Sequence, residues 1–370
     1  MTRRLAEVAK YVGVSEATVS RVLNGRPGIS DTTRNAVLTA LDVLGYERPV
    51  KLRGQRARLV GLVLPELQNP IFPAFAEVVA GALAKKGFTP VLCTRTTDGV
   101  AESDYVDMLL DQQVSGVIFA GGNYAQADAD HDHYHRLLRR GLPAILVNAS
   151  IDGLAFPRVS ADDAVAVEQA YGHLVSLGHK RIGLILGPTD HMPSRRKALA
   201  FKALASREPE PVAAAQGSEA QSLAAQSLGA RGSGAQPGGT AVKAPPAGRD
   251  YLVEHTFFSM EGGHAAATRL IERGATGLIC ASDVLALGAV RGVRRLGLDV
   301  PGDVSIVGYD DSAVMTCTDP PLTTIRQPIE AMGQAAVQLL IAEIAGSPVV
   351  ADELLFEPEL VVRASTSSVH

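Results

Sequence analysis

The 370-residue sequence contains no tryptophan and only three cysteines, and both shortages limit what the protein can be. Cys93, Cys280 and Cys317 are odd in number and show no Cys-x-x-Cys spacing, so the sequence predicts neither a disulfide framework nor a structural zinc site. No apolar run approaches the roughly 20 residues of a membrane-spanning helix, and the N-terminal residues are charged instead of forming an apolar signal segment. We therefore expect a cytoplasmic protein that is neither exported nor embedded in a membrane.

Signatures of catalysis and of cofactor binding are missing as well. The chain has no Gly-x-Ser-x-Gly, no Walker A run, no His-Glu-x-x-His and no Gly-x-Gly-x-x-Gly after a predicted strand. Three histidines gather in the run Asp-His-Asp-His-Tyr-His at 130–135, but residues two apart on a helix point away from each other. We expect an exposed polar helix start there, and we predict no enzyme activity, no cofactor and no metal site.

What the sequence does contain is a charge asymmetry. Residues 1–58 hold 11 Lys and Arg against five Asp and Glu, a net charge of +6, which leaves −10 for the rest of the chain. Basic charge held in one short segment of an acidic chain is typical of nucleic-acid contact, although a solvated charged tail would give the same count.

Three short helices are predicted in residues 1–46. The first ends at Gly13, the second is capped by Ser15, and the third is capped by Ser30 and stops at Gly45. Their inward faces carry Leu5, Val8, Ala9 and Val12, then Val19, Val22 and Leu23, then Val37, Ala40, Leu41 and Leu44. A helix, a turn containing glycine and a second helix with polar residues turned outward form a helix-turn-helix, whose second helix enters the DNA major groove.

The amino-acid sequence of this segment is similar to that of one protein family. Leu5-Ala6-Glu7-Val8-Ala9, Gly13-Val14-Ser15, Thr18-Val19-Ser20-Arg21-Val22-Leu23-Asn24 and Leu44-Gly45-Tyr46 resemble the headpiece of the LacI (lactose repressor) family. The resemblance implies that Glu16, Ala17 and Arg21 read bases, and that Thr18, Ser20 and Asn24 position the DNA backbone. The side chains suit these roles, since an arginine can bond guanine bidentately and an alanine methyl can pack on thymine. Phosphate contact alone is the alternative for Arg21, and a purely structural helical bundle is the alternative for the segment.

Residues 47–58 form a basic linker. In the family, this linker forms a short helix on DNA and a leucine from each subunit enters the minor groove, which implies that role for Leu52. Pro49 and Gly54 both disfavour a helix, so phosphate contact by Arg53 and Arg56 is the simpler prediction.

From residue 59 onward, short apolar runs alternate with helical patterns. We expect strands at 59–64, 90–93, 116–120, 144–147, 182–186, 277–280 and 304–308, and helices that include 75–86, 162–177, 261–273 and 284–296. Alternation of this kind predicts parallel sheets flanked by helices, with ligands bound beyond the carboxyl ends of the strands.

The resemblance extends across this part of the chain. It rests on Asn69-Pro70-Ile71-Phe72, Leu177-Gly178-His179-Lys180-Arg181-Ile182-Gly183, Val307-Gly308-Tyr309-Asp310-Asp311 and Pro321-Leu322-Thr323-Thr324-Ile325-Arg326-Gln327-Pro328. It implies an effector-binding and dimerisation domain over 59–370, similar to periplasmic sugar-binding proteins, with two lobes, three crossings and a ligand in the cleft. We expect lobe one at about 59–157 and 327–355, and lobe two at about 158–326 and 356–364.

The resemblance also implies the effector-binding residues. These are Phe72 and Phe258 for stacking, Asn148 and Asp310 for hydroxyl groups, and Ser282, Asp283 and Gln327 as further polar contacts. Lys197 stands where the family usually has an arginine, so either the preceding Arg196 takes that role or the ligand differs. The structural alternatives are a helix or turn cap for Asp310 and plain core packing for Phe258.

Residues 208–250 break the pattern. Of these 43 residues, 31 are Ala, Gly, Pro, Ser or Gln, and such a stretch cannot bury enough apolar surface to order itself. We expect a flexible insertion, with a partner-binding segment as the alternative.

Together these features predict an α/β protein with a helix-turn-helix headpiece and a two-lobed effector domain similar to periplasmic binding proteins. We expect a transcriptional regulator, a repressor of carbohydrate-utilisation genes, that binds a palindromic operator in double-stranded DNA as a homodimer and responds to a sugar or oligosaccharide. Gly45-Tyr46-Glu47-Arg48-Pro49 and Asn69-Pro70-Ile71-Phe72-Pro73 resemble actinobacterial regulators of malto-oligosaccharide or cellobiose use. Two alternatives are a sugar-active enzyme fused to a DNA-binding headpiece, which would need a nucleophile or paired carboxylates in the cleft, and a sugar-uptake receptor, which would need an export signal.

Overall fold

The computed structural model describes residues 2–24, 26, 28–46, 58–95, 99–206, 251–347, 349–350 and 352–369. The part of the predicted linker that holds Leu52, Arg53 and Arg56 lies outside these residues, and so does the predicted insertion at 208–250. Among the described residues, no helix has the length and apolar character needed to cross a membrane.

The headpiece consists of α1 (Thr2–Val12), α2 (Glu16–Leu23) and α3 (Asp31–Val43). The Ser15 hydroxyl accepts a hydrogen bond from the Thr18 amide and the Ser30 hydroxyl accepts one from the Thr33 amide, which confirms both predicted caps. The predicted inward faces share one small core, and the Tyr46 hydroxyl donates to the Glu7 carboxylate, so that the end of α3 is held against α1.

The first lobe is built on a six-stranded parallel sheet in the order β11-β5-β4-β3-β1-β2. Its elements are β1 (Leu59–Leu64), α4 (Ile71–Lys85), β2 (Thr89–Thr94), α5 (Glu102–Asp111), β3 (Gly116–Ala120), η2 (Asn123–Ala125), α6 (Asp132–Arg140), β4 (Ala144–Val147), β5 (Arg158–Ala161), α11 (Ile329–Ile344) and β11 (Glu353–Phe356). Strands β1, β3 and β4 are buried along their whole length because helices cover both faces of the sheet.

The second lobe has a six-stranded sheet in the order β12-β10-β9-β8-β6-β7, in which only β12 runs antiparallel to its neighbour. Its elements are α7 (Asp163–Ser176), β6 (Ile182–Leu186), α8 (Met192–Ala205), β7 (Val253–His255), α9 (Met260–Glu272), β8 (Gly277–Cys280), α10 (Asp283–Arg295), β9 (Ser305–Asp310), η3 (Ala313–Thr316), β10 (Thr323–Arg326) and β12 (Glu359–Val361). The predicted fold class is confirmed.

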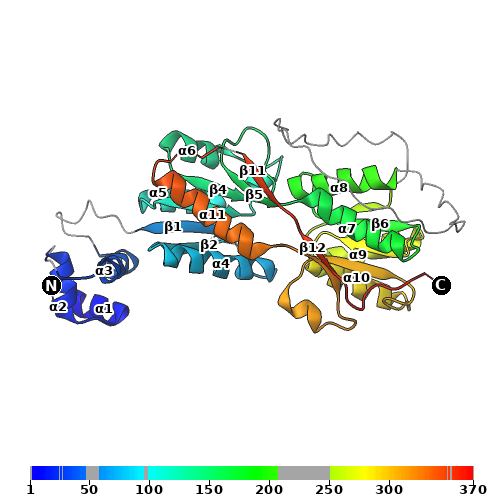
Figure 1. The fold of residues 1–370 in the computed structure, drawn as a ribbon, viewed down its shortest axis with the longest axis horizontal. Helices are drawn as coiled ribbons and strands as arrows, with labels where there is room; N and C mark the ends of the chain where they lie inside the picture. The colour runs from blue at the N-terminus through cyan, green and yellow to red at the C-terminus, as the bar shows by residue number, and fades with distance from the viewer. Residues whose placement is uncertain are drawn as a thin grey trace, which may run out of the picture.

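The chain crosses between the lobes three times, after β5, between β10 and α11, and between β11 and β12. Figure 1 shows the last crossing, where the red C-terminal segment runs from β11 in one lobe to β12 in the other. The boundary predicted at 157/158 is wrong, because Arg158–Ala161 forms β5, which pairs with β4 and β11 in the first sheet. The crossing therefore begins at residue 162.

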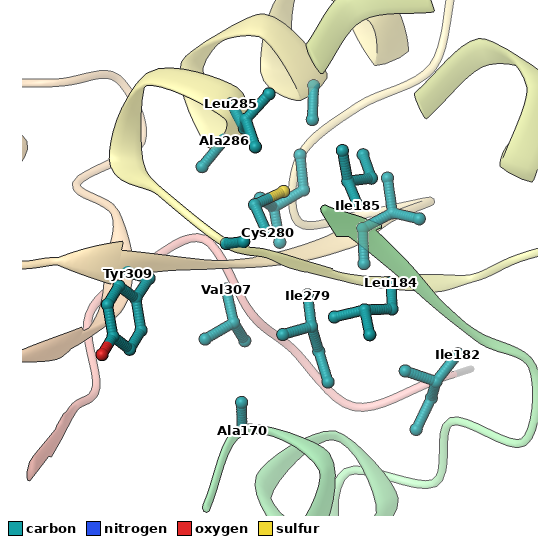
Figure 2. Packing of buried hydrophobic residues seen from close by; sticks show 14 of the residues in the cluster. Ala170, Ile182, Leu184, Ile185, Ile279, Cys280, Leu285, Ala286, Val307 and Tyr309 are labelled. Carbon is teal, nitrogen blue, oxygen red and sulfur yellow. The ribbon is translucent and has the colours of Figure 1, made fainter. Parts of the chain in front are cut away.

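The core of the second lobe holds the strands that end at the cleft described below. Tyr309, Val307, Ile279, Leu184 and Ile182 lie in a row on the face of the sheet that α7 covers, and Tyr309 is the last side chain of that row (Figure 2). Cys280 and Ile185 point to the opposite face, toward Leu285 and Ala286 of α10. This packing fixes the position of β9, at whose end Asp310 stands.

Candidate functional site

A cleft of about 900 Å³ opens where the carboxyl ends of strands from both sheets meet. Residues of both lobes line it, as expected for parallel α/β sheets. Seven of the predicted effector residues are among the lining residues: Phe72, Asn148, Lys197, Phe258, Ser282, Asp310 and Gln327. Arg196 and Asp283 are not.

Two of these lining residues have strained backbones. Asn148, after β4, has a φ of 73°, and Asp310, at the end of β9, has a φ of 119°. Left-handed φ values in residues other than glycine cost about 1–3 kcal/mol and concentrate at functional sites, where neighbouring structure holds them in place. For Asn148 that support includes its own amide, which donates to the Val159 carbonyl at 2.7 Å.

The Asp310 side chain is a buried acidic group in the lining of the cleft. It is 5% exposed, and the Gln327 side-chain amide donates to its Oδ1 at 2.7 Å. Within the described residues, its Oδ2 has no hydrogen-bond partner. Burial and the neighbouring Asp283 carboxylate raise the pKa of Asp310 well above its usual range, although Gln327, Lys197 and Asn69 act in the opposite direction. An unpartnered buried carboxyl oxygen in a cleft is suited to receive a hydroxyl group from a ligand.

Of the two neighbouring candidates, Lys197 lines the cleft and Arg196 does not; Arg95 is a second basic residue in the lining. The Lys197 ammonium forms an ion pair with the buried Asp163 carboxylate and lies 4.1 Å from the centroid of the Tyr309 ring. Burial raises the pKa of Asp163 above its usual value, although the nearby Lys197 ammonium acts in the opposite direction. A lysine has three donor hydrogens, so Lys197 can hold Asp163 and still donate to a ligand.

The predictions for Arg196 and Asp283 are corrected by the structure. The Arg196 guanidinium binds both carboxylate oxygens of Glu353, at 2.7 and 2.9 Å, and so joins α8 of one lobe to β11 of the other. Asp283 is fully buried, accepts from the Thr324 hydroxyl at 2.7 Å and from the Ser312 amide at 2.8 Å, and has a pKa raised to about 6, mainly by burial. Both side chains are occupied by protein contacts outside the cleft.

Other predicted residues have a structural contact as well as a place in the cleft. The Ser282 hydroxyl caps α10 by accepting from the Leu285 amide at 3.2 Å. Phe258 is half-buried, packs against the second-lobe core and meets the His191 ring edge to face at 5.4 Å. These contacts orient the two side chains without removing them from the cleft lining.

The prediction missed several lining residues, among them Glu66, Asp163, His191, Tyr309 and the exposed Phe257. His191 pairs with Gln126 of the first lobe in an isolated antiparallel bridge, and its Nδ1 lies 3.0 Å from the Ser194 hydroxyl. Burial and the Lys197 charge lower the pKa of His191 to about 3, so its ring is neutral. In the sequence, the only indication that His191 lines the cleft is its position soon after β6, which it shares with the neighbouring residues.

The headpiece presents the predicted reading face to solvent. Glu16, Ala17 and Arg21 on α2 are exposed, while Val19 and Val22 point into the core. Asn24 is also exposed, and Thr18 and Ser20 are half-buried. The Asn24 side-chain amide donates to the Ser20 carbonyl at 2.8 Å, which fixes the end of this helix.

A helix-turn-helix unit followed by two lobes around a polar cleft defines a class of protein, the DNA-binding regulator with a ligand-binding domain. Comparison with known families agrees: residues 4–48 match the bacterial regulatory proteins of the lacI family. Residues 57–230 match the periplasmic binding proteins and sugar binding domain of the LacI family, and residues 171–366 match a periplasmic binding protein-like domain. The chain belongs to the LacI family of transcriptional regulators.

Individual relatives span the whole chain. It is 50% identical over 368 residues to the HTH-type transcriptional regulator reg1 of Streptomyces lividans, and 48% identical over 368 residues to MalR of Streptomyces coelicolor. Each alignment covers 100% of this chain and 98% of the relative.

Solved structures with the same architecture include two with bound ligands. The complex of the transcriptional regulator CelR with cellobiose is 29% identical, with a TM-score of 0.65 over 98% of this chain and 99% of that one. The lac repressor dimer bound to operator and the anti-inducer ONPF is 26% identical, with a TM-score of 0.66 over 97% and 98% of the two chains.

Proposed function

We propose that this regulator is a repressor of carbohydrate-utilisation genes that acts on chromosomal DNA in the cytoplasm. It binds a palindromic operator as a homodimer through Glu16, Ala17 and Arg21, and a sugar in the interlobe cleft weakens that binding. The observation that carries the proposal is the cleft itself, in which Asp310 Oδ2, which has no hydrogen-bond partner in the described part of the chain, comes together with the half-buried Phe72 and Phe258. Carboxylates accept sugar hydroxyl groups, and flat aromatic rings cover the apolar C–H faces of sugar rings.

The named relatives support this proposal over the enzyme alternative, because they are transcriptional regulators. Two of the cleft carboxylates also have protein contacts: Asp163 forms an ion pair with Lys197, and Asp310 accepts a hydrogen bond from the Gln327 side-chain amide.

The direct test is an electrophoretic shift titration of the full-length protein on the DNA upstream of its own gene. Glucose, maltose, maltotriose and cellobiose are then added in turn to the protein–DNA complex. Release of the DNA by one of these sugars is the expected result. Sequence-specific binding that no carbohydrate weakens would contradict the proposed effector class.

The rim of the cleft favours an effector longer than one sugar ring. Phe257, between β7 and α9, is 79% exposed, and Leu67 of the first lobe is 44% exposed, yet both line the cleft. A large exposed aromatic side chain at the edge of a polar cleft is suited to stack on a second ring that extends outward.

Replacing Phe257 by alanine should therefore weaken the binding of maltotriose or cellobiose by about 2- to 10-fold, because one stacking contact is lost. Glucose binding should change little. Isothermal titration of each sugar measures both effects, with Leu199→Ala as the control, since Leu199 is an exposed apolar residue on α8 that does not line the cleft. An equal loss for all the sugars would contradict the outer contact.

A further inference from the structure

The histidine-containing run at 130–135 does not form the exposed helix start that its sequence predicts. In α6, His133 and Tyr134 are buried, with exposed fractions of 1% and 0%, while His135 is exposed. The reason is that His133, Tyr134 and Leu137 form the buried side of α6, where Tyr134 meets the Phe119 ring at 5.2 Å. Within the described residues, no group of three or more potential ligands could hold a metal ion.

These buried residues surround one carboxylate. Glu102, the first residue of α5, is 5% exposed. Its Oε1 lies 3.0 Å from Nε2 of His133 and also accepts from the Tyr134 hydroxyl, and its Oε2 accepts from the Asn123 amide at 3.4 Å. A buried carboxylate held by several donors is a rigid and costly arrangement, which stable packing alone does not require.

The hydrogen bonds continue from Glu102 to the cleft wall. The Tyr134 hydroxyl accepts from the Tyr124 amide at 2.9 Å. The Tyr124 hydroxyl accepts from the Gly121 amide at 2.7 Å and donates to the Val147 carbonyl, directly before the strained Asn148. Each of these three hydrogen bonds fixes the position of the segment after β3 or of the end of β4.

The segment after β3 also approaches Glu102 so closely that it needs glycine. A Cβ atom at Gly122 would lie 2.3 Å from Oε2 of Glu102, so a side chain there would displace the carboxylate. The chain at Gly122 and the carboxylate therefore fix each other's positions.

The segment 121–126 has two functions in the cleft. Gly121, Gly122, Tyr124, Ala125 and Gln126 all line it. The same segment touches the second lobe, where Gln126 bridges to His191 and the following Ala127 amide donates to the Asp190 carbonyl at 2.9 Å. The shape of this segment thus influences both the ligand contacts and the contact between the lobes.

We propose that Glu102 is a positioning residue for effector binding: with His133 and Tyr134, and through Tyr124 of the segment itself, it holds the segment 121–126 in the shape that receives the ligand and meets the second lobe. Glu102 does not line the cleft, so it acts only through this segment. The inference rests on the proposed sugar site and adds the residues that pre-form its first-lobe wall. Pre-forming a binding segment raises affinity because less ordering is left to occur on binding.

The test compares full-length variants by isothermal titration with whichever of maltose, maltotriose and cellobiose binds the wild type most tightly. Glu102→Gln keeps the shape of the side chain but replaces one acceptor oxygen by an NH₂ group. The three donors that share two oxygens in the wild type then have a single acceptor oxygen. We expect sugar affinity to fall about tenfold, in line with the loss of a charge-assisted hydrogen bond. Operator affinity without sugar should stay within about twofold of the wild type, and saturating sugar should still release the operator fully.

The histidine-containing run supplies a matched control pair. His133→Gln should weaken sugar binding, as Glu102→Gln does. His135→Gln, which changes an exposed residue of the same helix, should leave sugar binding unchanged. Hydrogen exchange gives a readout that general destabilisation would not reproduce. The amides of Gly121, Asn123 and Tyr124 should exchange faster in Glu102→Gln, while the second-lobe amide of Leu184, bonded to the Leu252 carbonyl, should not.

Wild-type sugar affinity in Glu102→Gln would overturn the proposal, and so would an equal loss in His133→Gln and His135→Gln. If Glu102→Gln does not fold, Tyr134→Phe decides, because it removes only one hydroxyl; unchanged sugar affinity in that variant would overturn the proposal too. The Asp310→Ala variant separates the two levels of inference. Loss of binding there with normal binding in Glu102→Gln refutes the positioning role alone, whereas a wild type that binds none of the three sugars refutes the proposed effector class and this inference with it.

Discussion

Replacing Asp310 by alanine should lower the affinity for the inducing sugar by about 10- to 150-fold, the worth of one charge-assisted hydrogen bond. Operator affinity in the absence of sugar should stay near that of the wild type, because Asp310 lies in the cleft and not in the headpiece. An inducer shifts a two-state regulator only through its different affinities for the two states. Cells that carry the variant should therefore keep the target genes repressed when the sugar is supplied.

The Asp310→Asn variant distinguishes a role of Asp310 in sugar binding from a purely structural role. Its remaining oxygen can still accept from Gln327, while the buried carboxylate is removed. A carboxyl group whose pKa is raised by folding binds more protons in the folded state than in the unfolded state. The free energy of unfolding therefore falls as pH rises from the pKa of this group in the unfolded chain to its higher pKa in the folded protein. The Asn variant should thus melt at a higher temperature than the wild type at pH 7, and yet bind sugar more weakly.

Calorimetric melting and isothermal titration on the same preparations measure both effects. A lower melting temperature together with normal sugar affinity would show that Asp310 is a turn-stabilising residue, as its position at the end of β9 would also allow.

The parts of the fold that could be predicted are those in which local sequence and burial agree. The apolar run at 59–64 forms β1, buried at every residue, and Ser15 and Ser30 cap the helices that their positions predict. The strands that were missed include β5, β11 and β12, which are short and carry polar residues such as Arg158 and Glu353. The pairing of β5 with β11 joins chain segments nearly 200 residues apart, and no local pattern contains that information.

The same limit explains the errors in the predicted site. Positions after strands could be predicted because topology alone brings them to the cleft. The choice between Arg196 and Lys197 could not, because neighbouring residues on a helix point about 100° apart and the rotation of α8 is set by tertiary packing. Glu102 resembles an ordinary exposed acidic residue in the first turn of a helix, and only the packing of α6 turns it into a buried hydrogen-bond acceptor.

For the headpiece, replacing Arg21 by alanine should cost about 1–3 kcal/mol of operator binding and relax the sequence preference at one base pair of each half-site. Arg21 is exposed on α2, one turn beyond Ala17, while Val19 and Val22 hold the opposite side of the helix in the core. The guanidinium is thus free to reach the edges of bases in the major groove, where a bidentate contact to guanine distinguishes one base pair from the others.

The measurement is a set of shift assays on the operator, on operators changed at single positions and on random DNA of the same length, all at one salt concentration. Lys10→Ala is the charge-matched control, because Lys10 is exposed on α1 outside the reading helix. Arg21→Ala should lose most of its affinity on the intact operator and little on random DNA, whereas Lys10→Ala should show a small loss that is equal on both. Equal losses on specific and random DNA for Arg21→Ala would instead assign Arg21 to the phosphate backbone, and the reading of bases would then fall to Glu16 and Ala17 alone.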